Sequence, residues 1–142
     1  MWRRFLIVDN YIGLMFLVIS AFLGALITRG QGFEIHFTIS MLSLASSAVA
    51  LVGSGIYLAV HPVEVRTRVP LIILNYIAAG FLLLATYAGF MIRQGVTFDY
   101  HFTISISAFF VISSAHILSA LFLAIKYKQP QGTAGKTSVT QE

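Results

Sequence analysis

Four apolar stretches, each about 20 residues long, constrain the fold of this chain more than any other feature. They cover approximately residues 11–28, 37–60, 70–92 and 102–125. A helix of about 20 apolar residues crosses the ~30 Å hydrocarbon core of a bilayer. Because 58% of the residues are hydrophobic and only 10% are charged, a soluble domain would lack the polar surface to cover four such segments. We therefore expect an all-α membrane protein with four transmembrane helices.

The chain also contains an internal duplication. The string His-Phe-Thr-Ile-Ser occurs at residues 36–40 and again at 101–105. A shift of 65 residues aligns 10–60 with 75–125 without a gap, and 18 of these 51 positions are identical. Self-similarity at a fixed period indicates repeated structural units. The duplication therefore predicts one helical hairpin that is used twice.

Short connections between the apolar stretches predict an antiparallel, up-down four-helix bundle built from these two tandem hairpins. The hairpins cover about residues 3–61 and 68–126, within one transmembrane domain of residues 1–128. Pro70 suits the start of the third helix. Residues 129–142 are polar and show no periodicity, which predicts a disordered cytoplasmic tail.

The distribution of charge predicts how the chain is oriented. Cysteine is absent, so disulfides, Cys-ligated zinc and iron–sulfur clusters are excluded. The net charge of +4 does not indicate nucleic-acid binding, because the basic residues are spread over the connections and ends. One side of the four-pass arrangement carries Arg3, Arg4, Arg66, Arg68, Lys126, Lys128 and Lys136, and the other carries Arg29 and Arg93. The positive-inside rule then places both termini in the cytoplasm of a cell-membrane protein, with the two repeated strings near the outer face.

One histidine occupies the same place in each hairpin. At 100° per residue, His36 and Ser40 share a face of the second helix with further serines, and His101 and Ser105 repeat this face on the fourth. The second and fourth helices of an up-down bundle lie on a diagonal, so the two imidazoles converge at one depth. That geometry is typical of bis-histidine haem ligation. We expect one haem b with His36 and His101 as axial ligands.

Other residues near the paired histidines are candidate contacts of such a cofactor. A ligating imidazole needs an acceptor for its second ring nitrogen. Ser40 and Ser105, a backbone carbonyl, or a nearby carboxylate would serve. Gly24 and Gly89 lack side chains near the same depth and would leave room for a flat macrocycle. Arg29 and Arg93 would pair with haem propionates.

These patterns also have structural explanations. Small residues allow close helix packing in membranes, and a histidine at the membrane boundary can bond a nearby acid. His116 is the one acidic or basic residue inside the four expected segments, and its counterpart is Leu51. It is a candidate quinone or proton site. Alternatively, His116 simply hydrogen-bonds a serine or main-chain oxygen.

The run Phe-Leu-Gly-Ala-Leu-Ile-Thr-Arg-Gly at residues 22–30, followed by His36, resembles the repeated unit of haem A synthase. In that family two four-helix halves are fused, and each half holds haem between histidines at the outer ends of its second and fourth helices. The resemblance implies this role for His36 and His101. The Glu-His-x-His-Arg motif of the catalytic half and the loop cysteines are absent here. The resemblance therefore implies haem binding without haem-modifying catalysis, and small b-type cytochrome membrane subunits fit the same pattern.

Three functional classes follow from these observations. The leading hypothesis is a haem b-binding, cytochrome-like protein that transfers electrons near the outer membrane face between a donor such as quinol and a redox partner protein, without being an enzyme on its own. The second is a cofactor-free accessory or assembly subunit of a larger, respiratory-type membrane complex. The third is a small transporter, which the scarcity of acidic and basic residues in the membrane disfavours. A homodimer would rebuild the eight-helix arrangement of the fused family.

Overall fold

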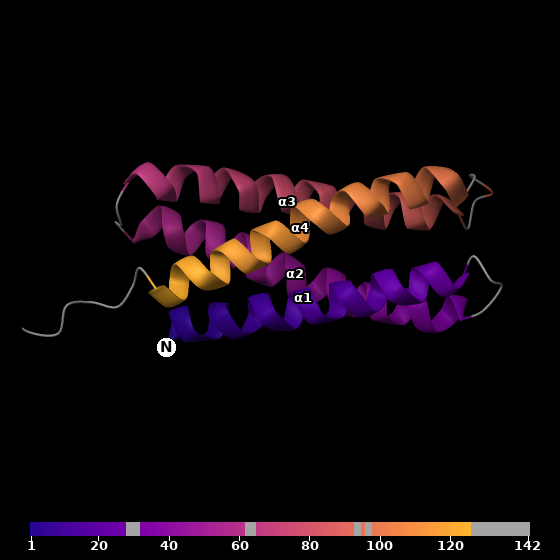
Figure 1. The fold of residues 1–142 in the computed structure, drawn as a ribbon, viewed down its shortest axis with the longest axis horizontal. Helices are drawn as coiled ribbons and strands as arrows, with labels where there is room; N and C mark the ends of the chain where they lie inside the picture. The colour runs from indigo at the N-terminus through magenta and orange to yellow at the C-terminus, as the bar shows by residue number, and fades with distance from the viewer. Residues whose placement is uncertain (28–31, 62–64, 93–94, 96–97, 126–142) are drawn as a thin grey trace, which may run out of the picture.

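The computed structural model describes residues 1–27, 32–61, 65–92, 95 and 98–125. Within them the chain forms four helices, α1 (Trp2–Ile27), α2 (Phe33–Val60), α3 (Val65–Ile92) and α4 (Phe98–Ile125). They run up and down in turn (Figure 1). Each is long and apolar enough to cross a membrane. The prediction of an all-α, four-helix membrane protein is confirmed, whereas the tail expected at 129–142 lies outside the described residues.

The helices are longer than the apolar stretches that predicted them. They have 26 or 28 residues, and a helix of this size is about 40 Å long at a rise of ~1.5 Å per residue. Because α1 begins at Trp2, Asp9 lies within a membrane-length helix, where its Oδ1 accepts a hydrogen bond from Ser46 Oγ at 3.2 Å. Asp9 lies just before the first expected apolar segment, so His116 remains the one acidic or basic residue inside the four segments expected from the sequence. Pro70 lies inside α3 rather than at its start, because the helix already begins at Val65.

Neighbouring helices pack in ring order. α1 and α3 each pack on both α2 and α4, whereas α2 and α4 touch only briefly across the diagonal. Figure 1 shows α4 starting beside α3 at one end of the bundle and finishing beside α1 at the other. We call the end at which α2 and α4 begin the His36 end, and the end with Trp2 and Ile125 the terminal end. The diagonal placement of α2 and α4 agrees with the predicted up-down bundle.

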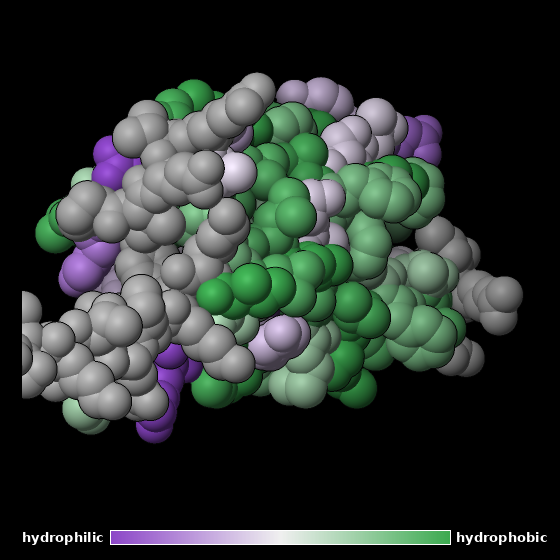
Figure 2. Space-filling view, turned by 60° about the vertical axis from the view of Figure 1, so that its left-hand side comes forward, coloured by the Kyte–Doolittle hydropathy of each residue, from purple (hydrophilic) through white to green (hydrophobic). Residues whose placement is uncertain are grey.

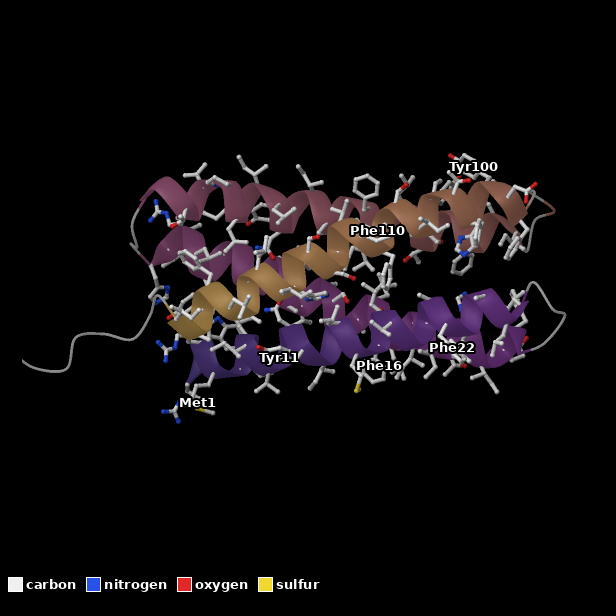
Figure 3. The ribbon with its side chains drawn as sticks, in the orientation of Figure 1. Met1, Tyr11, Phe16, Phe22, Tyr100 and Phe110 are labelled. Carbon is white, nitrogen blue, oxygen red and sulfur yellow. The ribbon has the colours of Figure 1, made fainter. Side chains whose placement is uncertain are left out.

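Apolar side chains cover the outside of the bundle. Phe22, Leu83 and Phe110 are each 65% exposed. Figure 2 shows a broad apolar surface over the helices, and Figure 3 shows Tyr11, Phe16 and Phe22 along the outer side of α1. Exposed apolar surface on this scale marks contact with a membrane. The helices therefore face the lipid bilayer, as expected for a multi-pass protein.

Two buried hydrogen-bonded clamps repeat the duplication in three dimensions. Asn10 Nδ2 donates to Ser54 Oγ at 2.9 Å, and Asn75 Nδ2 donates to Ser119 Oγ at 2.8 Å. Each amide also donates to a main-chain oxygen one turn earlier in its own helix. All four side chains are buried. Each clamp joins the two helices of one hairpin, so both hairpins share one packing pattern.

Candidate functional site

A cavity of about 440 Å³ lies between the two hairpins toward the His36 end. All four helices line it, mostly with apolar and aromatic side chains. Its volume lies within the ~300–1,000 Å³ range that is typical of small-molecule sites. The cavity brings together six of the residues predicted for a cofactor site, namely Gly24, His36, Ser40, Gly89, His101 and Ser105.

Each of the two histidines packs against the glycine of its own hairpin. A Cβ atom placed on Gly24 would lie 3.2 Å from His36 Cε1, and one on Gly89 would lie 3.2 Å from His101 Cε1. From the sequence we expected Gly24 and Gly89 to leave room for a macrocycle. In the structure the two imidazole rings occupy the space beside these glycines. The glycines allow each ring to approach the backbone of α1 or α3 closely.

The backbone of the neighbouring helix orients each imidazole. His36 Nδ1 lies 3.0 Å from the main-chain oxygen of Ser20. His101 interacts with the backbone of Ala85, which is the counterpart of Ser20 in the second hairpin. Because a carbonyl oxygen can only accept, His36 Nδ1 carries the proton and donates it. His36 Nε2 therefore holds a lone pair, as a metal ligand requires.

The serines one turn below the histidines make only long contacts with the imidazole rings. Ser40 Oγ lies 3.5 Å from His36 Nε2 but 2.6 Å from Ser20 Oγ, so its short hydrogen bond is with Ser20. Ser105 Oγ lies 3.4 Å from His101 Nε2. At these distances a serine competes weakly with a metal for the Nε2 lone pair.

Ser43 is a polar group of the cavity that the site prediction did not include. Its side chain lines the cavity and is only 3% exposed. Its Oγ has no hydrogen-bond partner among the described residues. A buried hydroxyl without a partner is costly, so Ser43 offers a hydrogen bond to a ligand in the cavity. Its counterpart, Ala108, lines the same cavity without a polar group.

The two histidines of the cavity are too few ligands for a bare metal ion but enough for a metal already bound in a macrocycle. Among the described residues, no three His, Cys, Asp or Glu side chains gather where they could hold a metal ion. Two imidazoles instead suit haem, whose macrocycle supplies the equatorial ligands and leaves two axial positions. The predicted propionate partners, Arg29 and Arg93, lie outside the described residues.

His116 lies outside the cavity and is 1% exposed. Its Nδ1 is 2.9 Å from Asn10 Oδ1, and its Nε2 is 3.0 Å from Ser47 Oγ. Because an amide oxygen can only accept, Nδ1 donates to Asn10 and Ser47 donates to Nε2. Both ring nitrogens therefore already have partners on other helices. The quinone or proton role of His116 stays a prediction.

The chain from Ser47 through His116 to Asn10 has the connectivity of a nucleophile, a base and an orienting group. However, Ser47 is 0% exposed and does not line the cavity. The cavity therefore gives a substrate no access to its hydroxyl.

The surroundings of His116 break the repeat at three positions together. Gly13, Ser47 and His116 correspond through the repeat to Ala78, Ile112 and Leu51, which pack together in the apolar core. A Cβ atom on Gly13 would lie 2.8 Å from His116 Cε1, so the imidazole needs a glycine there. Gly13 and Ser47 are absent from the residues predicted for a site. Their signal in the sequence is that both differ between the repeats, as His116 does.

Comparisons of the chain with models of protein families, with curated proteins and with solved structures find no match. The resemblance to haem A synthase and to b-type cytochrome subunits therefore stays an expectation from the residues quoted above.

Proposed function

We propose that this protein is a membrane cytochrome that binds one haem b between His36 and His101. The observation that carries the proposal is that these two imidazoles line one cavity, with His36 hydrogen-bonded to the backbone of Ser20 and His101 in the equivalent place beside Ala85. Bis-histidine iron takes one nitrogen from each side of the macrocycle. Helices on a diagonal of the bundle present ligands from opposite sides.

Bound haem would supply a centre that accepts and donates one electron. The residues of the chain would hold it and set its potential. The carbonyl of Ser20 fixes the His36 ring and increases its basicity as a ligand. The apolar walls would exclude water, and Ser43 Oγ would offer a hydrogen bond at the deep end of the cavity.

Basic residues support one orientation of this cytochrome in the cell membrane. Arg3 and Arg4 and the connection after α2 belong to the terminal end, which would face the cytoplasm. The haem would then lie near the outer face. Arg29 and Arg93 belong by sequence to the connections at the His36 end and would pair with the propionates.

Electron transfer is the function that this arrangement favours, with a quinol as donor and a redox protein as acceptor. Held by both His36 and His101, a haem would supply one-electron chemistry rather than a free site for a substrate. A second copy of the chain would give an eight-helix assembly and is a further candidate partner.

Absorption spectroscopy tests the proposal directly. The wild-type protein, purified from membranes of cells supplied with haem, should show a Soret band and an α band that sharpens on reduction. His36→Ala and His101→Ala should each lose the low-spin spectrum while still inserting into the membrane. His61→Ala is the matched control, because His61 lies at the terminal end, outside the cavity, and should leave the spectrum unchanged.

A well-folded wild-type protein that stays colourless with haem available would reject the cytochrome. The accessory-subunit hypothesis would then be preferred, and co-purification of a partner complex would test it. Retention of the full spectrum in both His36→Ala and His101→Ala would reject these ligands specifically.

A further inference from the structure

The cavity has two lateral seams that the repeat relates to one another, one between α1 and α4 and one between α2 and α3. In the α2–α3 seam, Phe37 and Phe90 pack edge to face, with ring centroids 6.5 Å apart. Their counterparts in the α1–α4 seam are Phe102 and Ala25. One seam therefore has a phenyl ring where the other has a methyl group.

Exposure also differs at one pair of counterparts, while Met41 and Phe90 of the α2–α3 seam are themselves 39% and 49% exposed. Ala21 and Ala25 line the cavity and are exposed. Each side chain is a single methyl group, so neither fills the seam at its position. Phe102 is 45% exposed, whereas its counterpart Phe37 is half-buried against Phe90.

The cavity also extends further along α4 than along α2. Phe109, Phe110 and Ile112 line it, but their counterparts Leu44, Ala45 and Ser47 do not. Figure 1 shows α4 diverging from α1 toward the His36 end, where the cavity lies. The cavity thus continues toward the seam that alanines border.

We propose that the cavity opens to the bilayer between α1 and α4 at Ala25, and that haem enters and leaves by this mouth. The inference rests on the proposed function. The cavity-lining side chains of α4 beside the mouth are apolar and exposed, with Phe102 at 45% and Ile106 at 44%. A route with such walls suits a macrocycle dissolved in the membrane, whereas the contact between Phe37 and Phe90 narrows the opposite seam.

The residue at the equivalent position of the other hairpin provides a substitution that should block the mouth. Ala25→Phe copies the residue at position 90, which lines the same cavity without filling it. Haem-free protein in detergent is mixed with haemin, and growth of the Soret band gives the rate of uptake. We expect Ala25→Phe to slow uptake and release about tenfold, as a barrier raised by ~1.4 kcal/mol would do, with an unchanged final spectrum.

Two further variants control for the size of the side chain at position 25 and for the choice of seam. Ala25→Ser adds only one heavy atom and should take up haemin at the wild-type rate. Phe90→Ala opens the second seam and should take up haemin at least as fast as the wild type, with the same final spectrum.

Each adverse result has its own meaning. Wild-type uptake in Ala25→Phe would overturn the α1–α4 mouth and leave haem binding in place, and a large acceleration in Phe90→Ala would then move the route to the other seam. Loss of haem binding at equilibrium in a folded Ala25→Phe protein would make position 25 part of the binding surface and would also overturn the mouth. A wild-type protein that never binds haemin would end both proposals.

Discussion

At the residue scale, three glycines decide where the histidine rings lie. Gly13, Gly24 and Gly89 each lie against an imidazole, at positions where a Cβ atom would come within 2.8 or 3.2 Å of its Cε1 atom. Small residues in membrane helices usually let two backbones approach. Here they let an aromatic ring approach a backbone. The contact is closest at Gly13, which makes this glycine the most sensitive of the three to substitution.

We expect Gly13→Ala to destabilise the protein by about 1–3 kcal/mol, because the added methyl overpacks the site and displaces the His116 ring. Combining it with Ser47→Ile and His116→Leu should recover most of this loss, because the triple variant copies the packing of Ala78, Ile112 and Leu51 in the apolar core. Thermal unfolding in detergent, followed by circular dichroism, measures both. A triple variant less stable than Gly13→Ala alone would contradict this account of the site.

Gly80→Ala is the matched control for the added methyl group. No atom lies within 4 Å of a Cβ placed on Gly80. Because alanine favours the helix over glycine by up to ~1 kcal/mol, this variant should be neutral or slightly more stable.

At the scale of elements, the two asparagine clamps differ in how many helices they join. Asn75 Oδ1 accepts a hydrogen bond from Ser119 Oγ at 3.1 Å, so this clamp connects only α3 and α4. Asn10 Oδ1 instead accepts from His116 Nδ1 at 2.9 Å. Asn10 therefore connects α1 to α2 through Ser54 and to α4 through His116, which ties the first helix of the chain to the last.

We expect Asn75→Ala to cost about 1–3 kcal/mol of stability, which is typical when buried polar partners lose a hydrogen bond. Asn10→Ala should cost more, because it leaves both the Ser54 hydroxyl and the His116 Nδ1–H without this partner. Unfolding in detergent at a fixed lipid content measures the difference. Equal losses in the two variants would show that the bond between Asn10 and His116 contributes nothing to stability.

At the scale of the whole molecule, the two hairpins place both of their internal connections at the same end of the bundle. The cavity lies toward this end, and the two Arg residues of the connections belong to it by sequence. The membrane face that this end occupies therefore decides on which side a haem would exchange electrons.

The absence of cysteine allows a direct test of orientation. We expect Gln94→Cys, in the connection between α3 and α4, to react with a membrane-impermeant maleimide in intact cells. His61→Cys should react only after the membrane is permeabilised, because the positive-inside rule places it in the cytoplasm. The reverse pattern would place the cavity at the cytoplasmic face, and equal labelling of both before permeabilisation would indicate mixed topology.

Sequence alone predicted the features that depend on length and period. The apolar stretches predicted four membrane helices because the thickness of the hydrocarbon fixes the length of a spanning segment. The repeat spacing predicted that His36 and His101 occupy equivalent places, and both line the same cavity. The start of α1 was missed because Arg3, Arg4 and Asp9 interrupt the hydropathy signal without ending the helix.

Only the tertiary structure decided which atoms meet. That His36 donates to the carbonyl of Ser20, that Gly24 underlies its ring, and that His116 joins Asn10 to Ser47 all depend on the rotation and relative height of packed helices. A helix face of small residues is compatible with many rotations and relative heights of the packed helices, because glycine, alanine and serine differ little in volume. The sequence therefore determined a pair of duplicated membrane hairpins, and their docking determined the hydrogen bonds, the cavity and its two unequal seams.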